Sequence, residues 1–273
     1  MPDIIALFGI IPPMSQLQKV WLLAFGFFVV LSAVCCLWCP ATAADMVIRY
    51  APMADAFARG EWYYAYHPRF GVLFMTLSGS IAWLTGLDGI RACQVAGIGL
   101  LSFCAIPVWC FVKTLFDTRA AWIAVAMTLI ATETFVYAID GLRDCGRTLG
   151  LALCILAFVR GRSWAMALGL FLLVTLRTDL LVITGTLLLV WWVIAIRKRE
   201  WCGLVLPTGA WLFGLFLMCL MTHAQTTPVP QFPAGAEVDA FVTNADTRGG
   251  HWAIFMTLEF PAAECADGGR VFD

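Results

Sequence analysis

Long apolar runs separated by short polar segments make up most of the chain. The run at 20–39 begins after Lys19 and is long enough for a helix to cross the ~30 Å hydrocarbon core of a bilayer. Further runs of spanning character follow at 92–111, 120–138, 149–159, 164–176, 180–196 and 204–221. This pattern predicts an all-α polytopic membrane protein with about seven transmembrane helices.

One apolar run leaves the topology open. Residues 70–87 are apolar but interrupted by Ser78, Gly79 and Ser80, so they could cross the bilayer, re-enter it, or lie along its interface. If they do not cross, the basic residues near the other runs all face the cytoplasm and the segment 45–69 faces outward. If they cross, the N-terminus lies outside. Both arrangements place the basic cluster 197–199 in the cytoplasm.

The predicted organisation has three parts. Residues 1–19 form an N-terminal cytoplasmic segment, and residues 20–221 form the transmembrane domain, with a first external loop at 40–91. Residues 222–273 form an extra-membrane tail, because their composition shifts to Thr, Pro, Gly and Asp.

Composition supports the membrane assignment and excludes one class of partner. The chain is 62% hydrophobic and 13% charged, with a mean hydropathy of +0.86, which no single soluble core could bury. The formal net charge of −1, with basic residues in short scattered clusters, argues against nucleic-acid binding. Most of the eleven cysteines fall in apolar runs, where a thiol behaves as a small hydrophobic group.

The segment 45–69 carries most of the candidate chemistry, because acids, bases and a histidine are seldom kept near membrane depth without a use. Its polar and aromatic residues occur in the order Asp45, Arg49-Tyr50, Asp55, Gly60-Glu61-Trp62 and Tyr66-His67-Pro68-Arg69.

This arrangement resembles the first external loop of the C-type membrane glycosyltransferases, the superfamily of protein O-mannosyltransferases and lipid A aminoarabinose transferases. Gly86-Leu87 with Arg91, and the step Leu-Phe-Asp-Thr-Arg-Ala-Ala at 115–121, extend the resemblance over roughly residues 20 to 200. The resemblance implies a GT-C-type helical bundle whose first loop is external and whose run 70–87 is juxtamembrane or re-entrant. It also implies inverting transfer of a sugar from a polyprenyl-phosphate carrier to a glycan, lipid or protein acceptor, at the outer face of the inner membrane.

The resemblance places Asp45 as the catalytic base, since inversion at the sugar needs a carboxylate that takes the acceptor's proton. The alternative reading of Asp45 is a solvated loop acid at the end of a span. A second acid is expected from the loop after the third span, where Asp140 or Asp144 stands. On a helix, Asp140, Arg143, Asp144 and Arg147 would share one face. The alternative interpretation of these four residues is a ladder of ion pairs at the membrane boundary, with no catalytic role.

The remaining candidates would bind the substrates. A leaving phosphate needs a nearby cation, and Arg69, Arg143, Arg147 and Arg177 are candidates. Substrate contacts are also assigned to Arg49, Tyr50, Trp62 and His67, although an interfacial aromatic belt and a bland interfacial histidine explain Trp62 and His67 equally well. If a divalent metal ion takes part, its candidate ligands are Asp45 and Asp144. Asp55 is expected to be a solvated acid on a helix face.

Two other functions stay open at this stage. A transporter or flippase would use Asp45, Asp140, Asp144 and Arg177 along a polar pathway through the bundle. A non-catalytic fragment of a glycosyltransferase is the other alternative, because relatives in the family continue through further spans beyond the position of Asp273. The sequence also departs from the family where Met46 follows Asp45, since many members have a second acid there.

Overall fold

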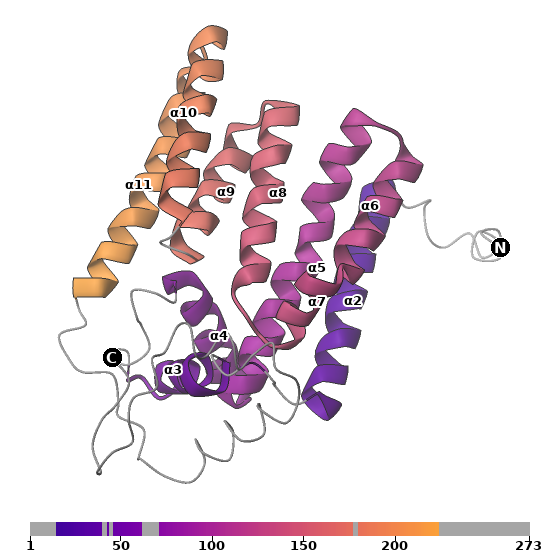
Figure 1. The fold of residues 1–273 in the computed structure, drawn as a ribbon, viewed down its shortest axis with the longest axis vertical. Coiled ribbons are helices and arrows are strands. Elements are labelled where there is room, and N and C mark those ends of the chain that lie inside the picture. The colour runs from indigo at the N-terminus through magenta and orange to yellow at the C-terminus, as the bar shows by residue number, and fades with distance from the viewer. Residues whose placement is uncertain (1–14, 40–42, 44–45, 62–70, 177–179, 224–273) are drawn as a thin grey trace, which may run out of the picture.

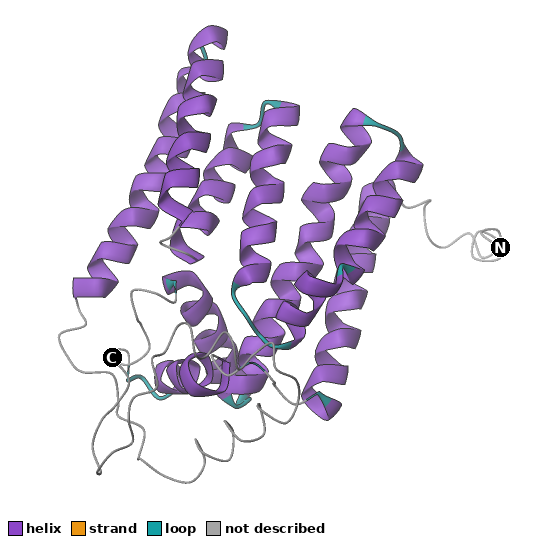
Figure 2. Ribbon diagram, viewed as in Figure 1, coloured by secondary structure: helices purple, strands orange, loops and turns teal. Residues whose placement is uncertain are grey.

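A computed structural model describes residues 15–39, 43, 46–61, 71–176 and 180–223, and every element within these ranges is helical (Figure 2). A short π-helical turn, η1, precedes α3, and two short helices, α3 and α4, separate the long helices α2 and α5 (Figure 1). The elements are α2 (Gln16–Trp38), η1 (Met46–Tyr50), α3 (Ala51–Ala58), α4 (Val72–Thr85), α5 (Gly89–Leu115), α6 (Thr118–Ile130), α7 (Thr132–Ile139), α8 (Asp144–Arg160), α9 (Ser163–Leu176), α10 (Leu181–Lys198) and α11 (Trp201–His223).

Four helices in the described part of the chain, α2, α5, α10 and α11, are long and apolar enough to cross a membrane. A fifth span is possible by the same measure if α6 and α7 form one broken span, since they meet at a bend of 48°. The apolar helices α4 and α9 are shorter, and α8 has 17 residues. The prediction of an all-α membrane protein is therefore confirmed at this level.

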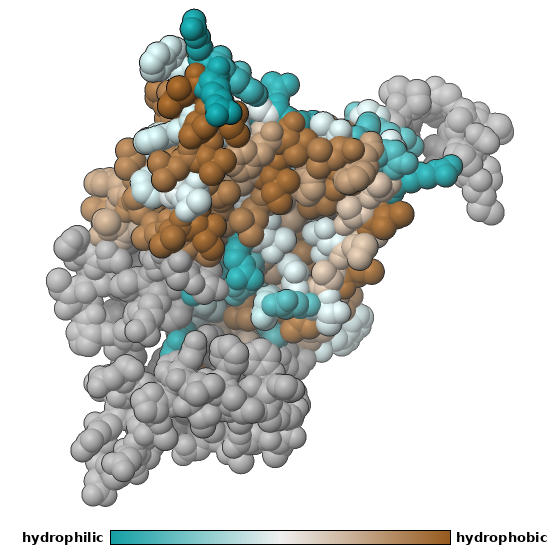
Figure 3. Space-filling model, turned by 45° about the horizontal axis from the view of Figure 1, so that its top comes forward, coloured by the Kyte–Doolittle hydropathy of each residue, from teal (hydrophilic) through white to brown (hydrophobic). Residues whose placement is uncertain are grey.

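The centre of the bundle is α5, which packs against α2 on one side and α8 on the other (Figure 1). Two thirds of its most apolar stretch is buried, whereas less than a quarter is buried in α2, α10 or α11. The outer faces of these three helices carry exposed Leu, Val, Phe and Trp side chains. Figure 3 shows a hydrophobic surface across the middle of the bundle, as expected for a surface that faces lipid.

The helices α2 and α5 run antiparallel. Arg91, in the first turn of α5, donates from Nε to the carbonyl oxygen of Cys36 near the end of α2, over 3.0 Å. Further along α5, the ring of Phe103 lies 5.9 Å from that of Trp21, which is near the start of α2. The connection from Cys39 to Asp88 thus leaves and re-enters the bundle at the same end, so α4 does not cross between α2 and α5.

Close approach of the helices depends on small residues. A Cβ atom on Gly169 of α9 would stand 2.8 Å from the carbonyl oxygen of Gly150 on α8 and 2.7 Å from Sγ of Cys154. Such contacts between small residues let backbones pack closely where lipid supplies no hydrophobic drive for association.

The two ends of the bundle differ in charge. The turns α5–α6, α8–α9 and α10–α11 lie at one end, which we call the basic end, at the top of Figure 1. These turns carry Lys113, Arg119, Arg160, Arg162 and the cluster 197–199. At the opposite end, which we call the loop end, α3 and α4 lie beside the junction of α7 and α8 (Figure 1).

Candidate catalytic site at the loop end

Several predicted site residues lie outside the described residues. These are Asp45, Trp62, His67, Arg69 and Arg177. The structure describes the other six, which are Arg49, Tyr50, Asp140, Arg143, Asp144 and Arg147.

The turn between α7 and α8 forms because Gly141 adopts a left-handed conformation, with φ of +69°. The N–H groups of Gly141 and Leu142 donate back to the carbonyl oxygens of Ala138 and Tyr137, which ends α7. The expected continuous helix through Asp140, Arg143, Asp144 and Arg147 is therefore not formed. Only Asp144 and Arg147 share a helix, so the prediction of one four-residue face was wrong, because the left-handed turn at Gly141 interrupts it.

Asp140 is the most enclosed acid among the described residues. It is the C-terminal cap of α7, it is 3% exposed, and its N–H group donates to the carbonyl oxygen of Val136 over 2.9 Å. An acid held inside a helical bundle of this kind marks a functional position more often than a surface acid does.

Asp144 and Arg147 stand one turn apart at the start of α8. Oδ1 of Asp144 lies 3.9 Å from Nη1 of Arg147, and the two side chains are 20% and 39% exposed. This is a long, partly solvated ion pair, and such pairs contribute little to stability. Asp144 also stands at the N-terminus of α8, where the helix dipole favours a negative charge. Arg143 precedes it and is half-buried.

The first loop meets this turn. Met46 begins η1 and is fully buried, and its Cε atom would lie 2.6 Å from a Cβ atom on Gly141. The backbone of α5 closes the same space, with the N atom of Gln94 at 2.8 Å from that position. Met46 follows Asp45 in the chain, and Gly141 follows Asp140. The contact therefore joins the two loops from which the sequence predicted the two acids.

Arg49 and Tyr50 lie on η1 in this contact region. The Tyr50 side chain is 3% exposed, and its ring meets that of Phe74 on α4 edge-on, with ring centres 5.9 Å apart. Packing against α4 accounts for the ring, which is not displayed as a stacking surface for a sugar. Arg49 is half-buried.

Gln94 is a residue that the sequence reasoning missed. It lies on α5, it is 1% exposed, and its Nε2 atom donates to the carbonyl oxygen of Cys39 over 3.2 Å. Within the described residues, its Oε1 atom accepts no hydrogen bond. A buried amide oxygen of this kind is costly to leave without a donor, so it is a ready acceptor beside the two loops. The only sequence signal was one glutamine inside an apolar run.

Asp55 also differs from its prediction. It is half-buried on α3, where α3 passes so close to α5 that a Cβ atom on Gly89 would clash with the carbonyl oxygen of Ala51. Burial raises the pKa of the Asp55 carboxyl, opposed by a hydrogen bond from the Gly89 backbone N–H and by the charge of Arg59. The expectation of a solvated acid was wrong, because the N-terminus of α5 covers it.

Arg91, one of the residues that carry the resemblance described above, has a structural explanation. Asp88 caps α5 by accepting from the Arg91 N–H group at 2.8 Å, and its second oxygen pairs with the Arg91 guanidinium at 2.6 Å. The same guanidinium reaches the end of α2. Arg91 thus fixes the α2–α5 junction that frames the loop end.

The described residues contain no group of three or more His, Cys, Asp or Glu side chains placed to hold a metal ion. Of the two predicted metal ligands, only Asp144 is among them.

Comparison with known proteins adds no relative: no protein-family model, no curated protein and no solved structure matches this chain.

Proposed function

We propose that the chain is a membrane glycosyltransferase that transfers a sugar from a polyprenyl-phosphate carrier to a glycan, lipid or protein acceptor. The proposal keeps the C-type bundle with about seven spans, in an inner membrane, and places the site at the loop end, facing outward. One observation carries it: the contact of Met46 with Gly141 brings the first loop and the α7–α8 turn together. Each of these segments adjoins an acid that such a transferase needs.

The charges around that contact suit the reaction. Asp140 is enclosed, whereas Asp144, Arg143 and Arg147 stand half-buried along the start of α8. A phosphate that leaves from a sugar gains negative charge, and fixed guanidinium groups stabilise that charge with little reorganisation. Arg143 and Arg147 would serve in this way, together with Arg69 and Arg177 from segments outside the described residues.

In the proposed step, the acceptor's hydroxyl oxygen attacks the anomeric carbon of the sugar while the bond from that carbon to the phosphate oxygen breaks. Asp45 takes the hydroxyl proton as the new bond forms. The electron pair of the broken bond leaves with the polyprenyl phosphate. Attack from the face opposite the phosphate inverts the anomeric centre, and Asp140, the more enclosed of the two acids at the α7–α8 turn, would help to orient donor and acceptor.

The polarity of the bundle is consistent with an outward site. Among the described residues, the turns at the basic end (Figure 1) carry seven basic residues and the loop end carries five, and an excess of basic residues favours the cytoplasmic side of a membrane. The site would then face the periplasm or the exterior, where polyprenyl-linked sugars are used by the family that the sequence resembles.

The test is turnover of a polyprenyl-phosphate sugar in membranes with equal amounts of wild-type protein and Asp45→Asn. The amide keeps the size of the side chain but cannot accept the proton, so turnover should fall by about 10²–10⁴-fold. Asp88→Asn is the matched control, since it removes an acid that caps α5 and should keep most of the turnover. Full turnover in Asp45→Asn would remove this residue from the chemistry. No turnover in any variant would favour a transporter or a non-catalytic fragment.

A further inference from the structure

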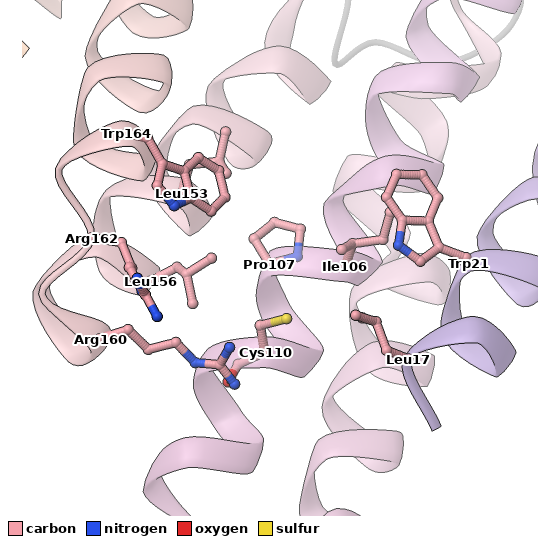
Figure 4. Close-up of a pocket in the computed structure, with 10 residues that line it drawn as sticks. All are labelled: Leu17, Trp21, Ile106, Pro107, Cys110, Leu153, Leu156, Arg160, Arg162 and Trp164. Carbon is pink, nitrogen blue, oxygen red and sulfur yellow. The ribbon is translucent and has the colours of Figure 1, made fainter. Parts of the chain in front are cut away.

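A cavity at the basic end has no part in the proposed transfer. It has a volume of about 390 Å³ and lies between α2, α5 and α8 (Figure 4). Ile106 and Pro107 of α5 form its floor, Leu153 and Leu156 of α8 form one wall, and α2 forms the other. Trp21 and Trp164 stand at its rim and are 48% and 53% exposed. The cavity therefore reaches the outer surface of the bundle.

Two guanidinium groups point into this apolar space (Figure 4). Arg160 is fixed at the end of α8, because its Nε atom donates to Oγ1 of Thr114 and its Nη2 atom donates to the carbonyl oxygen of Cys110, each over 2.9 Å. Arg162 follows in the α8–α9 turn. Neither arginine forms an ion pair with a carboxylate in the described part of the chain. The cavity thus combines an apolar interior with two positive charges that lack an anion there.

We propose that this cavity binds one anionic phospholipid, with its phosphate at Arg160 and Arg162 and an acyl chain along Ile106, Pro107 and Leu156. The charge is complementary, since Arg160 and Arg162 are the only charged residues among the described residues that line the cavity, and both are cationic. The depth also fits, because Trp and Arg side chains at helix ends mark the level of lipid headgroups. Basic pockets between spans are suited to anionic headgroups in the same way.

A lipid fits better than a soluble phosphate compound. Arg160 uses two of its five N–H donors on Thr114 and Cys110, and Arg160 and Arg162 are both exposed, so water competes with a small free anion for the remaining donors. The apolar floor and walls add chain contacts that only an amphiphile can use. The site is independent of the transferase proposal, since it lies at the opposite end of the bundle from Met46 and Gly141.

The experiment measures binding of single lipids to the full chain in detergent by native mass spectrometry. Phosphatidylglycerol is titrated against phosphatidylcholine with identical acyl chains, with soluble glycerol phosphate as a third probe. We expect one phosphatidylglycerol to bind at least about tenfold more tightly than phosphatidylcholine, as is typical for two basic residues near an anionic headgroup. Glycerol phosphate should not bind. Equal binding of the two lipids would overturn the proposal.

Two variants and one control locate the site. Arg160→Gln with Arg162→Gln should abolish the preference for phosphatidylglycerol, whereas Arg197→Gln with Arg199→Gln, at the same end but outside the cavity, should keep it. Ile106→Trp fills the cavity without changing a charge and should weaken binding of phosphatidylglycerol about tenfold or more through lost chain contacts. An unchanged preference in the first variant, loss in the Arg197 and Arg199 control, or unchanged binding in Ile106→Trp would each contradict the assignment.

Discussion

The Asp55 carboxyl lies half-buried where α3 crosses the N-terminus of α5, and its pKa is raised above the ordinary value of 3.8 because of burial. A carboxyl with a raised pKa in the folded state stabilises the fold only at low pH. Its contribution is fully present below 3.8 and is lost as the pH rises through the folded-state pKa. Ionised Asp55 therefore lowers the free energy of unfolding at neutral pH.

The variant Asp55→Asn should be more stable than wild type at neutral pH. The amide removes the buried charge, and its oxygen can still accept from the Gly89 N–H group. We expect a rise of roughly 2–4 °C in melting temperature, which corresponds to about 1 kcal/mol in a chain of this size. The gain should shrink as the pH approaches 3.8. Thermal unfolding in detergent across this pH range measures it.

Asp88→Asn is the control for that measurement, because Asp88 caps α5 and pairs with Arg91 at an exposed position. It should not be stabilised at any pH. A stabilisation of Asp55→Asn that is the same at all pH values would show that burial of the charge is not its cause.

At the scale of single residues, the sequence indicates some candidate acids but does not indicate which polar side chains are buried. Asp45 and Asp140 were chosen as candidates because each follows an apolar run, which is a local signal. The burial of Asp55 and Gln94 has no local signal. It arises because α5 packs over residues that are distant in sequence, at Ala51 and Cys39 respectively.

At the scale of the elements, Gly141 holds the two loops together. Its φ of +69° favours glycine, and its missing Cβ leaves room for Met46 and for the backbone of α5. The variant Gly141→Ala should lose about 2–5 kcal/mol of stability, from the left-handed strain and from overpacking together. It should also lower turnover by separating the loops. Unfolding and turnover, measured on the same preparation, check both effects.

Gly86→Ala separates strain from packing. Gly86 has a similar φ of +71°, but a Cβ atom there would meet nothing within 4 Å. It should lose only about 1–2 kcal/mol and keep turnover. Equal losses in the two variants would show that the Met46 contact does not matter.

The apolar runs predicted most of the helices well, because a run long enough to span a bilayer has few alternatives to a helix. The runs at 20–39 and 92–111 correspond to α2 and α5, and the last two runs to α10 and α11. The run at 120–138 is instead two helices that meet at 48°. No Pro or Gly lies near Ala131 to indicate that break, and both α6 and α7 pack on α5.

At the scale of the whole molecule, the antiparallel packing of α2 and α5 brings the end of α2 and the start of α5 to the same end of the bundle. The sequence left the crossing of 70–87 open, since basic residues could be counted in two ways. The contacts of Arg91 with Cys36 and of Phe103 with Trp21 make α2 and α5 antiparallel neighbours, so the segment between them begins and ends at the same end of the bundle. No local sequence pattern indicates these contacts.

We expect Glu61→Cys to react with an impermeant thiol reagent from outside the membrane, and Glu200→Cys to react only after the inner face is opened. Both positions are exposed, Glu61 at the loop end and Glu200 in the α10–α11 turn at the basic end. Ala56 would be unsuitable, because it is 3% exposed. The starting protein for both variants lacks the exposed thiols of Cys202 and Cys219, and labelling of this starting protein is the control. Labelling of both positions from the same side would contradict the two-ended arrangement.

The central claim is that the first loop and the α7–α8 turn build one catalytic site, and turnover of Asp45→Asn, Asp140→Asn and the double variant tests it most directly. Residues that act as a unit are strongly non-additive. Each single variant should lose about 10²-fold or more in turnover at equal amounts of folded protein, and the double variant should lose little more than the worse single one. Full turnover in Asp140→Asn, or losses that multiply in the double variant, would contradict a shared site.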